Sequence, residues 1–366
     1  MKIEDYKDGF RIVSIALDEQ IKEDLLCDKL DFLLVKDNIV TLFPDEKILT
    51  LKEESYSKLF ESSNYDVYEL WPDGSLHRCF DNSNDDNYFF VTGKCNSNCI
   101  MCPSPEPARR NGSTESFHTL IEIAKHIPSD TKHLTITGGE PFMIGSEIFS
   151  FMQYLKEKFE DTEFLLLTNG RIFAIQKYVD LLVKHTPNNL VIAIPLHGST
   201  DQIHDEITQS KNSFKQTVKG IKRLLKNKFR VELRIVISKL NEDDFQALTD
   251  FVINEFKGIS YVSIIAMEMT GNARVNKDKV WVSYKESQKK ISVGIRKLIE
   301  SEIDVKLYNY PLCTIESELW TLCEKSISTN KVRYTEECDI CKVKKACGGV
   351  FAGTLSMEKD ELEAII

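Results

Sequence analysis

The sequence predicts an α/β fold built on a parallel sheet. From about residue 88 to residue 269, short apolar runs rich in β-branched residues alternate with amphipathic helical stretches. Strand–helix units in series imply right-handed crossovers and parallel strands. Six such units form either an open doubly wound sheet or a partial barrel. In both architectures the functional residues lie at the carboxyl ends of the strands.

The elements follow one another in a regular order. We expect six strands, each closing on a turn or a motif: 88–93, 133–141, 163–170, 189–198, 229–238 and 259–269. Between them, apolar residues recur at helical spacing, which predicts helices over 116–127, 146–159, 172–185, 214–227 and 243–256. The polar motifs of this region stand at the ends of the strands, where a site is expected.

The flanking regions do not share this rhythm. Residues 1–85 read as a small, mostly β extension, for which a packing role is favoured over the alternative of a peptide-docking module. Residues 86–275 make up the strand–helix domain. Residues 276–309 are expected to link it, through a helix over 281–302 and a short strand, to a cysteine-rich region over 310–366.

Composition narrows the class of protein. The chain has 366 residues and a net charge of −10, which argues against bulk attraction to nucleic acid or to an anionic membrane. Its charged first residues, MKIEDYKDGF, predict no signal peptide, and no stretch is apolar enough to predict a membrane span. We therefore expect a cytoplasmic protein whose ten cysteines stay reduced. Cys27 and Cys79 are isolated and are expected to be structural, and the other eight fall into two groups for which metal or cluster ligation is favoured over disulfides.

Three cysteines follow the first predicted strand with C-x3-C-x2-C spacing, in KCNSNCIMCP. Cys95, Cys99 and Cys102 cannot complete a structural zinc site, which takes four protein ligands. A [4Fe–4S] cluster also normally takes four cysteines, so three of them leave one iron open to a substrate or cofactor.

A second motif closes the next predicted strand, about 35 residues further on. In TGGEP, Gly138 and Gly139 let the backbone approach a ligand closely, and the Glu140 carboxylate can accept a charge-assisted hydrogen bond from an ammonium group. A lone GGE carries little information. Its combination with C-x3-C-x2-C, each at the end of a strand, is highly specific.

At these two motifs the chain resembles the radical S-adenosylmethionine (SAM) superfamily. The resemblance implies a partial (βα)6 barrel of the TIM type, a [4Fe–4S] cluster with one open iron, and SAM bound to that iron. It assigns Cys95, Cys99 and Cys102 to the cluster and the GGE motif to the SAM amino group. Met101 stands where the family usually has an aromatic residue near the adenine, so this sequence departs from the pattern there.

Three further residues are candidates for binding SAM or substrate. Asn169, in LTNG, is either a SAM contact or a turn residue, and His197, in PLHG, is either a ligand contact or a structural histidine. Arg234 is a charge inside a predicted strand and needs a partner, for which the SAM carboxylate is one candidate.

The second cysteine group lies near the C-terminus. Cys338, Cys341 and Cys347 have C-x2-C-x5-C spacing, and Cys313 lies upstream. Spacing alone leaves a structural zinc and a second [4Fe–4S] cluster open. The group resembles the SPASM or twitch extensions of radical SAM enzymes, which implies one auxiliary [4Fe–4S] cluster. Cys323 is the alternative to Cys313, although it lies in a helical pattern.

The C-terminal stretch from NYPLC to CGGVFAG is similar to the His-Xaa-Ser system radical SAM maturases of the HxsC type. This resemblance implies an oxidoreductase that cross-links a ribosomally made peptide encoded nearby, with an external electron donor and, as an open question, a second maturase subunit. Two other hypotheses stay open: a radical SAM enzyme acting on a small molecule or nucleotide, and a non-catalytic iron–sulfur subunit.

Overall fold

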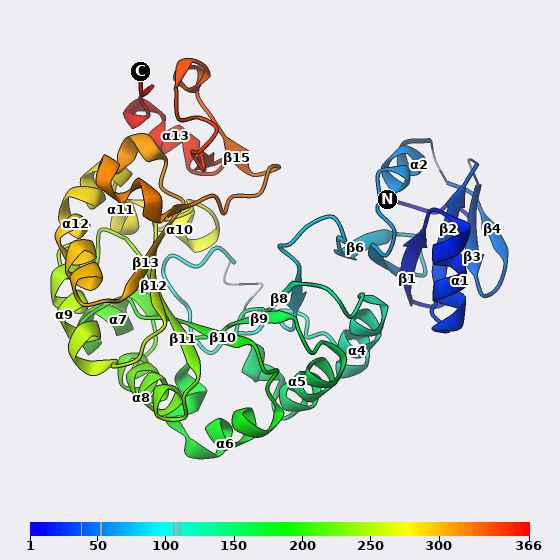
Figure 1. Cartoon of the computed structure of the whole chain (residues 1–366), viewed down its shortest axis with the longest axis horizontal. Coiled ribbons are helices and arrows are strands. Elements are labelled where there is room, and N and C mark those ends of the chain that lie inside the picture. The colour runs from blue at the N-terminus through cyan, green and yellow to red at the C-terminus, as the bar shows by residue number, and fades with distance from the viewer. Residues whose placement is uncertain (38, 52, 105–106, 108, 110) are drawn as a thin grey trace.

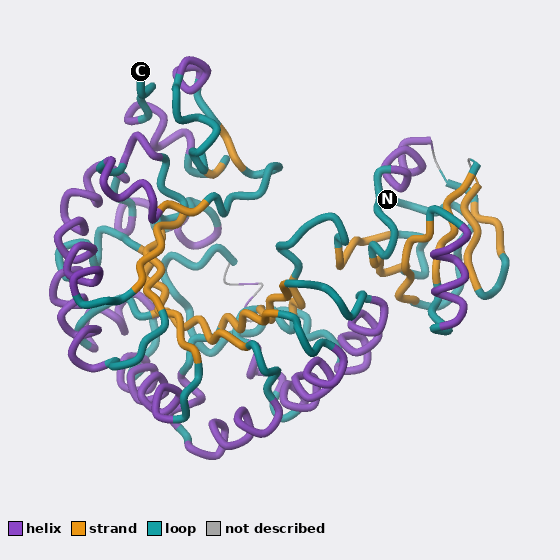
Figure 2. The backbone as a smooth tube through the Cα atoms, in the orientation of Figure 1, coloured by secondary structure: helices purple, strands orange, loops and turns teal. Residues whose placement is uncertain are grey.

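The computed structural model describes the chain except for residues 38, 52, 105–106, 108 and 110. Figure 1 shows a curved sheet with helices along its outer side, an N-terminal unit beyond one end of the curve and a C-terminal segment at the other end. Figure 2 shows the same arrangement as strands inside and helices outside. Among the described residues, no helix is both long and apolar enough to cross a membrane.

The curved sheet has eight strands, in the order β14-β13-β12-β11-β10-β9-β8-β7, and every neighbouring pair is parallel. This confirms the predicted parallel α/β fold. The strands are β7 (Tyr88–Phe90), β8 (His133–Thr137), β9 (Glu163–Leu167), β10 (Leu190–Pro195), β11 (Arg230–Val236), β12 (Tyr261–Ile265), β13 (Asp304–Tyr308) and β14 (Cys323–Glu324). The sheet therefore extends two strands beyond the six that the alternation predicted.

Helices connect successive strands, and most of them lie on the convex side of this sheet (Figure 1). They are α4 (Phe117–His126), α5 (Glu147–Lys158), α6 (Gln176–His185), α7 (Asp201–Thr208), α8 (Ser213–Lys226), α9 (Phe245–Glu255), α10 (Gly271–Val275), α11 (Lys277–Val280) and α12 (Tyr284–Glu300). Helix α7 was not predicted, and the stretch 171–174 forms a 3-10 turn before α6. The other predicted helices are present with small shifts at their ends.

Alternation along each strand separates the two faces of the sheet. In β11, Val231, Leu233 and Ile235 belong to the main apolar core under the helices, whereas Glu232 and Arg234 point to the concave face. The concave face is therefore the side that carries polar groups, because the convex side is covered by the apolar faces of the helices.

Residues 1–80 form a second sheet of six strands, in the order β4-β3-β2-β1-β5-β6. The prediction of a mostly β extension is confirmed, with the addition of two helices. Its elements are β1 (Arg11–Ala16), α1 (Glu19–Cys27), β2 (Phe32–Lys36), β3 (Ile39–Phe43), β4 (Lys47–Leu49), α2 (Glu53–Phe60), β5 (Val67–Leu70) and β6 (Leu76–Phe80).

Part of the N-terminal sheet packs into the core of the barrel, although most of its buried apolar residues form two clusters of their own. Ile12, Val67 and Phe80 lie in the same apolar cluster as Phe89 of β7 and Leu120 of α4. A buried hydrogen bond also joins the Ser14 hydroxyl to Nδ1 of His126 at 2.8 Å. Burial of apolar surface across this junction stabilises the contact between the two units. The packing role of residues 1–85 stays a prediction.

The C-terminal region covers the β14 edge of the sheet. It contains 3-10 turns at Leu312–Thr314, Ser317–Leu322 and Glu336–Ile340, the two-stranded pair β15 (Val332–Arg333) and β16 (Val350–Phe351), and α13 (Leu355–Glu358). The helical pattern predicted around Cys323 is wrong: the 3-10 turn ends at Leu322, and Cys323 begins strand β14, because the parallel pairing with β13 replaces further helical turns.

The shared core predicts that the two sheets unfold together. Replacing Phe80, which is 2% exposed, with alanine should lower the free energy of unfolding by about 3 kcal/mol. Phe60→Ala, at a site 41% exposed, should cost less than about 1 kcal/mol. Urea unfolding followed by circular dichroism measures both, and a Phe80→Ala protein that loses only its N-terminal part in a separate transition would contradict the shared core.

Candidate active site

The three cysteines of the first group lie in the loop between β7 and α4. Each is partly exposed, and the pKa of Cys99 is raised to about 12 by burial and by the charges of Cys102 and Cys95. Burial also raises the pKa of Cys95, with contributions from Glu140 and Cys102. The three thiols therefore lie within electrostatic reach of one another. In the described part of the chain, no three Cys, His, Asp or Glu side chains converge closely enough to hold a single metal ion. A [4Fe–4S] cluster takes its cysteine ligands on separate irons, so it does not require the three thiols to converge on one point.

The two glycines of GGEP pack against the backbone that leads into this loop. A Cβ on Gly138 would lie 2.5 Å from the Thr92 carbonyl oxygen, and one on Gly139 would lie 2.4 Å from that of Lys94. Backbone hydrogen bonds join Gly139 to Thr92 at 2.7 Å and Glu140 to Lys94 at 2.8 Å. Glycine is required here because the chain approaches its own backbone, and not only for the predicted approach to a ligand.

The Glu140 carboxylate is turned into the protein and is 2% exposed. Its Oε1 accepts hydrogen bonds from the Thr168 hydroxyl at 2.8 Å and the Phe142 N–H at 3.2 Å, and its Oε2 accepts one from the Asn169 N–H at 2.7 Å. Burial raises its pKa, and these donors oppose that shift. Glu140 therefore ties the ends of β8 and β9 together. Contact with the SAM amino group stays a prediction.

A polar clamp holds the loop between Cys95 and Cys99. The Arg171 guanidinium donates to the Asn96 carbonyl at 2.8 Å and to the Ser97 hydroxyl at 3.0 Å. The Asn169 amide donates to the Asn96 side-chain oxygen at 2.6 Å. Asn169, predicted as a SAM contact or a turn residue, thus bonds the cysteine loop itself. Arg171 was not predicted, although it directly follows the TNG motif at the end of β9.

The other side of the loop is held by two segments far away in the sequence. The N–H groups of Asn98 and Ile100 donate to the last carbonyls of α7, those of Thr208 and Ile207, at 3.1 and 2.9 Å. The Asn272 side chain donates to the Cys99 carbonyl at 3.0 Å. The other contacts come from the side chain of Asn276 to Ile100 and from the Arg109 guanidinium to Asn98 and Ser104.

Met101 and His197 are both buried. Met101 packs in a small apolar cluster with Ile207 and Met267, so its contact with adenine stays a prediction. The His197 ring stacks on His204, with 5.9 Å between centroids, and its Nδ1 has no hydrogen-bond partner among the described atoms. Burial lowers the pKa of His197 to about 3, so the ring is neutral and is free to accept or donate one hydrogen bond.

Arg234 lies on the concave face, where its guanidinium donates to Glu232 at 3.0 Å and stacks over the ring of Tyr308. The hydroxyl of Tyr261 donates to the other oxygen of Glu232 at 3.1 Å. The partner that the sequence required for Arg234 is therefore found within the sheet. A contact between Arg234 and the SAM carboxylate stays a prediction.

The second cysteine group surrounds one small cavity in the C-terminal region. Cys313, Cys338, Cys341 and Cys347 all line it, together with Tyr334 and Leu362. The pKa of Cys313 is raised by burial and by the charges of Cys347 and Cys338. Cys323 is not among the described residues that line this cavity, and its thiol donates to the Leu319 carbonyl. The geometry therefore groups Cys313, rather than Cys323, with the other three.

The clamp predicts a role for Arg171 in keeping iron in the loop. Arg171→Met removes the donors to Asn96 and Ser97, so a ferrous chelator should strip iron about tenfold faster from the reconstituted protein. Absorbance under anaerobic conditions measures this rate. Arg274→Met, at an exposed site on α10, is the matched control, and equal stripping rates in the two variants would contradict the clamp.

Comparison with known proteins places this site in a family. Residues 89–252 match the model of the radical SAM superfamily. A GTP 3′,8-cyclase of Helicobacter pylori is 27% identical over 183 residues, which cover 48% of this chain and 54% of that protein. The subtilosin biosynthesis protein AlbA of Bacillus subtilis is 32% identical over 141 residues, covering 37% of this chain and 29% of AlbA. The matched parts thus span about half or less of these relatives.

Solved structures share the fold. The chain superposes on anSMEcpe with bound AdoMet and a peptide at a TM-score of 0.57, with 14% identity over 76% of this chain and 91% of that one. It superposes on Streptococcus suis SuiB bound to S-adenosylmethionine at a TM-score of 0.51, with 15% identity over 69% of this chain and 54% of SuiB. These structures share the fold of this chain, and residues 89–252, which hold the cysteine loop and most of the parallel sheet, match the radical SAM superfamily model.

Proposed function

We propose that this chain is a radical SAM enzyme that oxidatively cross-links a ribosomally synthesised peptide, in the manner of the HxsC-type maturases. The single observation that carries the proposal is that one chain contains two separate sets of cysteine thiols. Three thiols lie at the mouth of a parallel barrel, and four line a cavity at the far edge of its sheet.

The first thiol group fits a cluster with one open iron. Three mutually close, partly exposed thiols would supply three ligands, and the loop that carries them is held rigidly by hydrogen bonds from β9, α7 and α10. When bound, such a cluster supplies the electron that cleaves the C5′–S bond of SAM and releases a 5′-deoxyadenosyl radical. The residues of the chain fix the ligands in place, so that little reorganisation accompanies the reaction.

The second thiol group fits a fully ligated cluster. Its four cysteines meet the ligand count of a [4Fe–4S] centre, and the cavity between them is also lined by apolar side chains such as Leu312, Val350 and Leu362. A centre of this kind can accept an electron from the substrate, which makes the net reaction oxidative. Oxidation is what the formation of a cross-link between two C–H or X–H groups requires.

Peptide modification is favoured over the alternative, a small-molecule or nucleotide substrate. AlbA, whose printed role is in bacteriocin biosynthesis, is the more identical of the two relatives described above, at 32%. The cyclase relative, at 27%, supports the alternative and keeps it under test. For the peptide reaction we further propose an external electron donor. Reconstitution of the reaction with the purified chain tests whether a second maturase subunit is also required.

Iron analysis tests the second thiol group. Cys313→Ala should lower the iron content of the reconstituted chain by about four atoms, because one missing ligand destabilises the whole centre. Cys323→Ala should leave the content nearly unchanged. Metal and sulfide analysis with EPR of the reduced protein measures both, and zinc bound at the site, or an equal loss in Cys323→Ala, would contradict the assignment.

Mass spectrometry tests the function itself. Co-expression with each small open reading frame beside the gene should produce one peptide that loses two hydrogens per cross-link. The loss should disappear in the Cys95→Ala, Cys99→Ala and Cys102→Ala variants, because each removes a ligand of the first group.

The remaining outcomes separate the alternatives. An unchanged peptide mass, with 5′-deoxyadenosine formation stimulated by a metabolite, would move the assignment to a small-molecule enzyme. Complete absence of 5′-deoxyadenosine under strong reductant, in a protein with full iron content, would leave the non-catalytic hypothesis.

A further inference from the structure

A groove with a volume of about 510 Å³ lies where the N-terminal sheet meets the barrel. Its walls come from three parts of the chain: strands β5 and β6 with the turn that follows, strand β7 with the start of α4, and Asn330 of the C-terminal region. The volume is in the range of small-ligand sites, about 300–1,000 Å³. The functions considered so far give this groove no role.

Two sheet edges border the groove. Strand β6 ends the N-terminal sheet and β7 ends the barrel sheet, so in the described structure each pairs with a strand on one side alone. The Asn87 carbonyl and the Val91 N–H form hydrogen bonds with β8. Because the backbone groups of successive residues in a strand point to opposite sides, those of Tyr88 and Phe90 point away from β8. The side chains of Tyr88 and Phe90 are 58% and 43% exposed. An unpaired edge beside exposed aromatic residues is a template for an added strand.

The added strand would be short, because the edge of the sheet beyond Phe90 already pairs with another segment of the chain. Glu115 N–H donates to the Val91 carbonyl at 3.0 Å, and Gly93 N–H donates to that of Ser113 at 2.8 Å. Residues 113–115 thus occupy the edge beyond Phe90. The open part covers three residues of β7 and ends at Glu115, whose carboxylate lines the groove.

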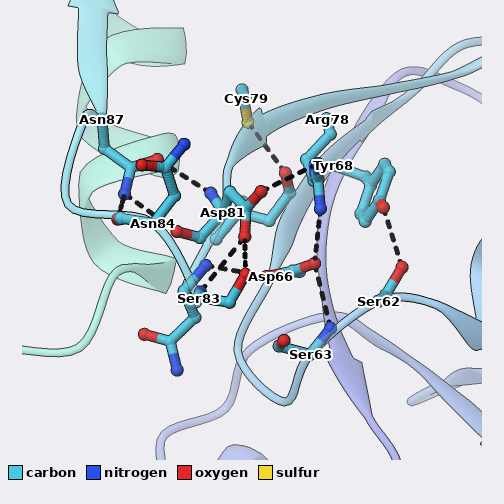
Figure 3. Close-up of polar contacts among 12 residues, drawn as sticks. Ser62, Ser63, Asp66, Tyr68, Arg78, Cys79, Asp81, Ser83, Asn84 and Asn87 are labelled. Atoms are coloured by element: carbon cyan, nitrogen blue, oxygen red, sulfur yellow. Dashed lines mark hydrogen bonds and ion pairs between the residues drawn. The ribbon is translucent and has the colours of Figure 1, made fainter. Parts of the chain in front are cut away.

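The groove carries an excess of negative charge. Of its described lining residues, Arg78 is the single arginine or lysine, and Figure 3 shows it between Asp66 and Asp81, with which it forms ion pairs of 3.2 and 2.8 Å. Among the ion pairs of the described residues, none joins Glu69 or Glu115 to a cation. Burial raises the pKa of Glu115, and the negative charge of Glu69 adds to this shift.

We propose that this groove binds an extended, basic segment of the substrate peptide as an added strand on β7, with its cationic side chains between Glu69 and Glu115. The proposal rests on the peptide-modifying function proposed above and gives the N-terminal sheet its part in it. Strand β7 runs directly into the cysteine loop, so a segment on its edge lies next to the path by which the peptide reaches the concave face.

Binding of defined peptides to the full-length chain tests the proposal. The probe is fluorescein-labelled Thr-Lys-Val-Lys-Thr-Lys-Val, followed by fluorescence anisotropy without SAM or reductant. The same peptide with glutamate in place of lysine should bind at least about tenfold more weakly, because its charges repel those of the groove. A lysine peptide N-methylated at alternate residues should lose a similar factor, because it cannot pair with a strand edge.

Matched protein variants locate the site. The double variant Glu69→Gln, Glu115→Gln should weaken binding of the lysine peptide about tenfold. Glu160→Gln with Glu318→Gln removes the same charge from two exposed positions elsewhere and should have no effect. Hydrogen exchange should show protection of 76–80 and 88–90 by the peptide. Equal binding of the lysine and glutamate peptides, an unaffected groove variant, or protection confined to other segments would overturn the proposal.

The experiment separates this proposal from the function on which it rests. Binding is measured without turnover, and 5′-deoxyadenosine formation is measured without peptide, so each can fail alone. Selective binding in a chain that does not cleave SAM would retain the groove and reject the radical function. Normal SAM cleavage without selective binding would retain the enzyme and reject the groove.

Discussion

The site depends on one constraint: the cysteine loop has no regular secondary structure, so its shape must be imposed by its surroundings. The closest of these is the backbone of GGEP, which lies against residues 92–94 at a distance that no side chain at Gly138 or Gly139 would permit. The next residue, Glu140, accepts hydrogen bonds from Thr168 and Asn169 at the end of β9. The next residues along, Asn169 and Arg171, then hold Asn96. The ends of three neighbouring strands are thereby locked into one unit before any cofactor binds.

This arrangement gives three residues of the GGEP motif a structural role in addition to the predicted contact with a ligand. Gly138 and Gly139 are needed because backbone meets backbone, and Glu140 is needed because three donors converge on a buried carboxylate. A buried carboxylate with satisfied acceptors is stable, whereas its removal would leave donors unpaired, at a cost of about 1–3 kcal/mol for each. The motif thus supports the loop whether or not it also touches SAM.

The parts that the sequence predicted well are those encoded locally. Runs such as LVIAIP and the spacing of Cys95, Cys99 and Cys102 are read from a few neighbouring residues. Helix α7 escaped prediction because DQIHDEIT has few apolar positions and buries His204 and Thr208 instead. Arg171 escaped because its partner, Asn96, lies 75 residues away and nothing in either segment indicates the other. The pairing of β14 with β13, which overrode the helical pattern around Cys323, is likewise a long-range effect.

The open barrel explains where the remaining parts of the chain lie. A closed barrel has no edges, but this sheet stops at β7 and β14, and an uncovered edge invites pairing with other chains. The N-terminal sheet packs beside β7, and the region with four cysteines supplies β14 itself, so each end of the sheet has its own accessory unit (Figure 1). The two units approach each other at the groove, where Asn330 of one joins β6 of the other. On the proposals made above, peptide recognition would lie on the side of the N-terminal sheet and the electron-accepting cluster on the side of the C-terminal region.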